Sequence, residues 1–163
     1  MQALDLSLAK ELLEQLTDPE IPVITLSEMG ILRAVEQDND TVVVTITPTY
    51  SGCPAMQQIR EDIISTLQQG GFAKVEVQSV LSPAWTTDWM TDNAKAKLRA
   101  YGIAPPVCTS QQAATTQPIS FKVACPQCGS MNTAVVSEFG STSCKALWRC
   151  KACREPFDYF KPF

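Results

Sequence analysis

Two CxxC pairs near the C-terminus constrain the fold of this chain more than any other feature. They are Cys125-Pro-Gln-Cys128 and Cys150-Lys-Ala-Cys153, separated by 21 residues. Each pair can offer two thiolates to one ion, and two pairs complete the tetrahedral set of a closed structural zinc site. A redox-active CxxC or free thiols would be the alternatives for a single pair. Since both pairs lie in one short β-prone segment, the sequence predicts a zinc ribbon whose folding depends on its metal.

The chain has 163 residues with seven cysteines and no histidine. An odd number of cysteines and the absence of a recognisable export signal indicate thiols used for metal binding or reactivity, and a cytoplasmic location. No apolar run approaches the ~20 residues of a membrane span. Without histidine, Ser-His-Asp catalysis, Cys-His catalysis and histidine-ligated metal sites are excluded. Any chemistry must be thiol-based or carboxylate-based.

Hydrophobic periodicity predicts a mixed domain before the ribbon. The expected elements are a helix over 4–16, strands over 31–37 and 41–47, a helix over 53–70, a strand over 72–81 and a helix over 91–102. This α-β-β-α-β-α order is typical of a two-layer α+β domain.

Changes in composition along the chain predict three parts. We expect the α+β domain over residues 1–103 and a linker over 104–119, because the latter stretch is rich in Pro, Ser, Thr, Gln and Ala without apolar periodicity. Residues 120–163 then form the zinc ribbon, with FKVAC, TAVVSEFG, CKALWRC and EPFDYF as its β-prone pieces.

The charge distribution disfavours nucleic acid as the partner of the ribbon. Residues 120–163 carry six Lys/Arg and three Asp/Glu, but four thiolates with one Zn²⁺ would reduce that +3 to +1. Residues 1–119 carry seven Lys/Arg against fourteen Asp/Glu, a formal −7. Phosphate binding requires a basic stripe that this chain lacks. A protein partner is therefore expected.

Cys53 is the second candidate metal ligand. It follows Thr-Pro-Thr-Tyr-Ser-Gly, between a predicted strand and a predicted helix. A thiol at a helix N-terminus has its pKa lowered by the helix dipole and the free N–H groups, which favours the thiolate. The hydroxyls of Thr47, Thr49 and Ser51 could donate hydrogen bonds to its sulfur. The plainer interpretation is a thiol that only caps the helix.

Two other segments are expected to approach the Cys53 loop. Asp18-Pro19-Glu20 places two carboxylates on a rigid turn, although these could simply bind loop amides. Trp85 and Trp89 follow the last predicted strand of the domain, and core packing is the favoured interpretation for both.

Cys144 and Cys108 complete the cysteine count. Cys144 could be a buried small hydrophobe, a substitute zinc ligand or a reactive thiol, and free cysteines are usually buried. Cys108 lies in the expected linker and is expected to be inert. A cluster needs about four protein ligands, so a site shared with Cys53 would require Cys144 to face the Cys53 loop, in one chain or across a dimer.

Long motifs resemble those of known families. DPEIPV, TPTYSGCP and LSPAWTTDWMT, within residues 8–103, resemble the metal-sulfur cluster biosynthesis family, whose small α+β domains act in iron-sulfur cluster assembly and transfer. With CPQC, SEFGSTSCKAL and RCKACREPFDYF added, nearly the whole chain resembles the PaaD-type, or D-type, subunits of bacterial phenylacetyl-CoA epoxidase.

This resemblance implies an accessory role in aerobic phenylacetate degradation. It implies a maturation factor, not itself catalytic, for a multicomponent oxygenase whose oxygenase or reductase subunits would be the partners. Cys53 matches the family pattern most firmly, and Asp18, Glu20 and Thr47 match it less closely. The alternatives are a structural adaptor subunit without metal transfer, with Cys53 only as a cap, and a thiol enzyme acting on a coenzyme A thioester. The thiol enzyme is disfavoured because no histidine base accompanies the thiol.

Overall fold

The computed structural model describes residues 3–107 and 122–162 and divides into two compact units. The chain up to Trp85, together with Trp89–Thr91, forms the first unit. Thr86–Asp88 and the chain from Asp92 onward form the second. Each unit is described by itself.

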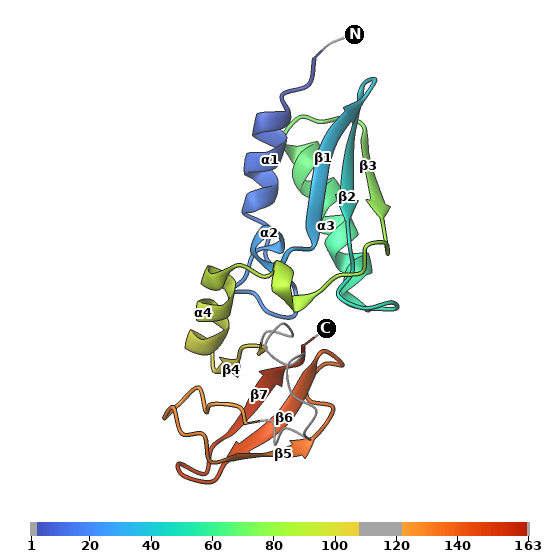
Figure 1. Cartoon of the computed structure of the whole chain (residues 1–163). Helices are drawn as coiled ribbons and strands as arrows, with labels where there is room; N and C mark the ends of the chain where they lie inside the picture. The colour runs from blue at the N-terminus through green and yellow to red at the C-terminus, as the bar shows by residue number, and fades with distance from the viewer. Residues whose placement is uncertain (1–2, 108–121, 163) are drawn as a thin grey trace. The chain divides into compact units, whose positions relative to one another are not determined.

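The first unit packs helices on one face of a small sheet (Figure 1). Its elements are α1 (Leu6–Glu14), α2 (Leu26–Met29), β1 (Leu32–Asp38), β2 (Thr41–Ile46), α3 (Ala55–Gln69) and β3 (Val75–Ser79). The strand order is β1-β2-β3, with β1 antiparallel and β3 parallel to β2. Helix α1 packs beside α3 and along β1, while α3 packs against β3. The predicted two-layer α+β fold is confirmed.

The sequence periodicities explain which faces are buried. Alternate residues of β2, Val42, Val44 and Ile46, are fully buried, as a strand with one covered face requires. Helix α3 buries Ile59 and Ile63 at helical spacing against that face.

Helix α2 was missed by the sequence analysis. It has only four residues, too few for a periodic pattern, but its N-terminus is a capping box in which the Thr25 hydroxyl accepts from the Glu28 N–H and the Glu28 carboxylate accepts from the Thr25 N–H. It ends at Gly30, whose φ of +77° is left-handed. A Cβ there would lie 2.8 Å from the Trp89 Cβ, so only glycine fits.

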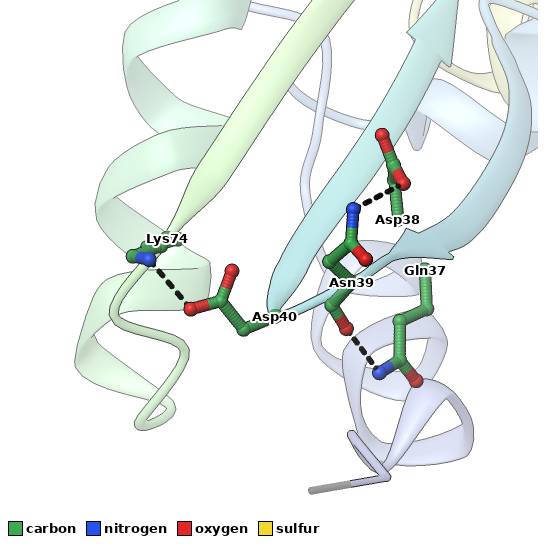
Figure 2. A network of polar contacts seen from close by, with 5 residues as sticks. All are labelled: Gln37, Asp38, Asn39, Asp40 and Lys74. Atoms are coloured by element: carbon green, nitrogen blue, oxygen red, sulfur yellow. Dashed lines mark hydrogen bonds and ion pairs between the residues drawn. The ribbon is translucent and has the colours of Figure 1, made fainter. Parts of the chain in front are cut away.

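The β1–β2 turn confirms the predicted hairpin, and Figure 2 shows its polar contacts. Asn39 adopts φ +55°, its carbonyl accepts from the Gln37 side chain and its amide donates to Asp38. Lys74 forms an ion pair with Asp40 and, by donating a hydrogen bond, holds the pKa of that carboxyl below its usual value. Because both side chains are exposed, this pair contributes little to stability.

The second unit contains the cysteine-rich sheet (Figure 1). Its elements are η1 (Thr87–Trp89), α4 (Asp92–Ala100), β4 (Ile103–Ala104), β5 (Thr133–Ser137), β6 (Lys145–Cys150) and β7 (Pro156–Phe160). The last residue of η1, Trp89, lies with the first unit. The strand order is β4-β7-β6-β5. Its buried apolar cluster includes Trp148 and Tyr159, whose rings meet edge to face with centroids 5.8 Å apart.

The structural division differs from the predicted boundaries at two places. The expected α+β domain ran to residue 103, but α4 lies in the second unit, and β4 pairs in parallel with β7 of the ribbon sheet. Ala104, the expected start of the linker, therefore belongs to a strand; a two-residue strand leaves no alternating pattern in a sequence. FKVAC also differs, since residues 122–125 form no strand. Most of the expected linker, residues 108–119, lies outside the described residues.

No helix among the described residues is long and apolar enough to cross a membrane.

Candidate functional site

The two CxxC pairs converge on one point in the ribbon. The sulfurs of Cys125, Cys128, Cys150 and Cys153 all lie within 4.8 Å of one another. Cys125 Sγ is 3.8 Å from Cys153 Sγ, and Cys128 Sγ is 3.6 Å from Cys150 Sγ. Four sulfurs placed tetrahedrally at about 2.3 Å from a zinc ion would be about 3.8 Å apart. The spacing of these thiols therefore fits a single four-coordinate ion.

Tight turns place these sulfurs. The Gly129 N–H donates to the Cys125 carbonyl at 2.9 Å, and Gly129 adopts a left-handed φ of +75°. In the second knuckle Arg154 is also left-handed, with φ +69°, after which the chain enters β7. The Cys153 N–H lies 3.5 Å from the Cys150 sulfur. Backbone N–H groups aimed at sulfur are expected around a thiolate.

The thiols of the second knuckle do not ionise independently. The Cys153 N–H lowers the pKa of the Cys150 thiol to about 6, against the opposing effect of burial. A hydrogen bond from the Glu155 N–H lowers the pKa of the Cys153 thiol, but desolvation and the three neighbouring thiols outweigh it and raise that pKa to about 12. The first thiolate thus suppresses ionisation of its neighbours. A divalent cation is what would let all four thiols ionise together, so the four cysteines form a metal-binding group.

The Cys53 loop lies in the first unit beside a small cavity of about 210 Å³. The cavity is lined by the residues immediately before Cys53 and by part of the segment that follows β3: Thr47, Pro48, Thr49, Tyr50, Ser51, Leu81, Ala84 and Trp85. The predicted approach of these two segments is therefore observed. Tyr50, Leu81 and Ala84 were not predicted as site residues, although all three lie within the motifs quoted above.

Cys53 itself is half-buried at the start of α3. Its N–H donates to the Tyr50 carbonyl at 3.3 Å, which closes the loop. The expected hydrogen bonds from Thr47, Thr49 and Ser51 to the sulfur are not formed in the described part of the chain. Thr47 and Thr49 are buried and line the cavity instead. The thiol is thus available to a ligand from outside.

The carboxylates of the Asp18–Glu20 turn do not join Cys53 in a metal-binding group. Asp18 is 5% exposed, and its Oδ1 accepts from the Glu20 and Ile21 N–H groups at 2.8 and 3.0 Å. Asp18 therefore binds loop amides, the plainer of the two interpretations. Among residues 3–107 and 122–162, the four ribbon cysteines are the only set of three or more His, Cys, Asp or Glu close enough to share an ion.

Both tryptophans after β3 support the fold. Trp85 is buried, and its indole N–H donates to the Met29 carbonyl at 2.9 Å. Trp89 lies under the Arg33 guanidinium, 3.8 Å from the ring centroid. The predicted core role is confirmed for Trp85, whereas half-buried Trp89 makes a cation–π contact with an exposed side chain.

Cys144 matches the first of its three predicted alternatives, the buried small hydrophobe. It is 4% exposed, its sulfur lies 2.9 Å from the Thr142 hydroxyl, and it is not among the clustered thiols. Its burial argues against the predicted site shared with Cys53, since a shared ligand must be open to the second site. Cys108 lies outside the described residues.

Comparisons with known proteins match both parts of the chain. Residues 9–79 match an iron-sulfur cluster assembly protein domain, and residues 109–161 match the PaaD zinc beta ribbon domain. The D-type subunit of the Escherichia coli (strain K12) protein named "Putative 1,2-phenylacetyl-CoA epoxidase" is 51% identical over 92% of this chain and 88% of its own length. This chain belongs to that D-type family.

Relatives that match only the first part of the chain are shorter proteins. The Fe-S protein maturation auxiliary factor YitW of Bacillus subtilis (strain 168) is 35% identical over 53% of this chain and 85% of its own length. A solved domain of unknown function DUF59 from Bacillus anthracis superposes with a TM-score of 0.51 at 31% identity, covering 56% of this chain and 92% of its own. The first unit is therefore a fold that also exists alone, to which the D-type family adds the ribbon.

Proposed function

We propose that this protein is an accessory maturation factor for a multicomponent phenylacetyl-CoA epoxidase, in which Cys53 takes up iron or an iron-sulfur cluster and delivers it to an oxygenase or reductase subunit. The observation that carries the proposal is an accessible thiol beside a hydroxyl-lined cavity. That thiol lies within the 9–79 segment that matches an iron-sulfur cluster assembly protein. The same proposal places the protein in the cytoplasm, where its thiols stay reduced.

A single thiolate suits delivery better than storage. A cluster held permanently uses about four protein ligands, and the first unit offers only Cys53 in an open position. The remaining ligands would come from the client or from a second copy of the chain. Hydroxyl groups of Thr47, Thr49 and Tyr50 give the non-protein ligands of the cargo possible hydrogen-bonding partners. Such a site binds its cargo weakly and can release it.

The ribbon cysteines have a different role in this proposal. Cys125, Cys128, Cys150 and Cys153 hold one zinc ion, which has no open coordination position and therefore supplies structure rather than catalysis. The stabilised ribbon contacts the client. Asp18 supports the turn near the start of the first unit and is not proposed as a ligand; Glu20 and Thr47 stay as candidates for contact with the cargo.

Complementation tests the proposal in the cell. In a strain lacking its own D-type protein, Cys53→Ser should abolish growth on phenylacetate, because serine can cap α3 but cannot replace the thiolate. Cys144→Ala is the matched control: it removes a thiol that is buried, and growth should persist.

Protein abundance and zinc content must be equal in the two strains for the comparison to hold. If Cys53→Ser supports normal growth while deletion of the protein does not, a structural adaptor without metal transfer is the better account.

A further inference from the structure

The ribbon carries a hollow that its metal centre does not explain. It measures about 410 Å³ and lies beside the second knuckle. Its lining residues are Ala134, Val136, Arg149, Cys150, Lys151 and Arg154. Three of the six are cationic and none is a carboxylate, so the hollow joins an apolar floor to a basic rim.

The three cations have no anionic partner within residues 3–107 and 122–162. Arg149, Lys151 and Arg154 are all exposed, and none of them forms an ion pair with a described carboxylate. Arg149 uses Nε to hold the Arg154 carbonyl at 3.3 Å. Three like charges gathered around one hollow repel each other, and an anionic ligand would relieve that repulsion.

Strand β5 forms the other side of the hollow and ends the sheet. Its only strand partner in the described chain is β6. Val135 and Val136 are 53% and 59% exposed, and the register shifts between Val135 and Ser137. An exposed apolar edge strand is a template for pairing with another polypeptide.

The strand register relates these two features. Ala134 pairs with Arg149, so Ala134 and the cation share one face of the sheet, while Val135 pairs with Trp148 on the other. A strand added beside β5 would present alternate side chains to these two faces. Acidic side chains at every second position would meet the basic rim, and apolar ones between them would meet Val135.

We propose that residues 133–137 with Arg149, Lys151 and Arg154, here called the basic edge, dock an extended segment of a partner protein in which acidic and apolar residues alternate. This goes beyond metal handling and does not depend on Cys53.

Two other occupants fit the basic edge less well. A nucleic acid cannot pair with the backbone N–H and C=O groups of β5, and the chain as a whole carries a formal −4. A second copy of the chain, paired through β5 about a two-fold axis, would bring a second Arg149, Lys151 and Arg154 towards the first set. Charge complementarity therefore favours an acidic partner segment.

A model peptide tests the basic edge with the full-length, zinc-loaded protein. The probe is a labelled, end-blocked dodecapeptide that alternates Glu and Val, and the control peptide has Lys in place of every Glu. Fluorescence anisotropy should show binding of the acidic peptide alone, weakened by added salt. Backbone amide shifts on binding should be centred on residues 133–137.

Charge reversal on the protein locates the contact. Lys151→Glu and Arg154→Glu should each weaken binding of the acidic peptide by about tenfold. Lys122→Glu makes the same charge change elsewhere on the ribbon and should leave binding unchanged. Zinc content, measured for each variant, shows that the ribbon is still folded.

Several results would overturn the proposal. They are failure of the acidic peptide to bind, equal binding of the lysine peptide, no effect of either charge reversal in zinc-loaded protein, binding of a twelve-nucleotide strand in place of the peptide, or self-association of the chain that the same reversals abolish.

Discussion

The first unit and the ribbon each hold a small sheet together, but they do so by different means. In the first unit the core consists of aliphatic side chains such as Val42, Ile46, Ile63 and Leu67, all fully buried. In the ribbon, two of the eight residues in the buried cluster are the ligands Cys125 and Cys150. Metal binding and core packing are therefore one process in the ribbon. The first unit needs no metal, so its thiol at Cys53 is free to handle one.

Removing the metal should separate the two units most strongly. We expect Cys150→Ser, or a strong chelator, to release zinc and unfold the ribbon while the first unit stays folded. Structural zinc contributes about 10–16 kcal/mol to binding-coupled folding, which exceeds the whole stability of many domains. Two-dimensional NMR of the full chain would show loss of dispersed ribbon amides only. Loss of the first unit's signals as well would break the comparison.

A cavity in the first unit should have the opposite selectivity. Ile63 is fully buried, so Ile63→Ala should lower the free energy of unfolding of the first unit by about 2–5 kcal/mol. Zinc should stay at one ion per chain. Ile64→Ala is the matched control, because Ile64 is only half-buried and the same truncation should cost less. Denaturant unfolding followed on each unit measures both; a zinc loss with Ile63→Ala would contradict the account.

The smallest effect is expected at the exposed Lys74–Asp40 pair. The pKa of Asp40 is lowered from 3.8 in the folded state, so the pair's contribution is present above that pH and is lost as the pH falls below it. Both side chains are more than 60% exposed, so Lys74→Ala should leave the unfolding midpoint at pH 7 within error of the parent. A large shift at pH 7, absent at pH 3, would show that the turn matters more than its exposure suggests.

Much of the fold could be predicted because its main elements leave strong local patterns. Helix α3 and the β1–β2 hairpin follow from 3.6- and 2-residue periodicities and from a polar turn. Helix α2 and β4 could not be predicted, since elements of four and two residues carry no period. The pairing of β4 with β7 joins segments more than fifty residues apart, and nothing local encodes it.

The sites divide in the same way. The CxxC spacing predicts that Cys125, Cys128, Cys150 and Cys153 belong together, and their sulfurs do converge. The surroundings of Cys53 could not be predicted in the same detail. Whether a hydroxyl donates to a sulfur or lines a cavity depends on side-chain packing around the loop, not on spacing along it.

Anaerobic reconstitution tests the central claim, that the chain separates a structural thiol site from an open one, most directly. Parent protein and Cys53→Ser would be incubated with ferrous iron and sulfide, desalted, and analysed for zinc, iron and sulfide. The account predicts one zinc per chain in both proteins, with iron and sulfide retained only where Cys53 is present. Equal iron in the two proteins, or iron in place of the zinc, would contradict it.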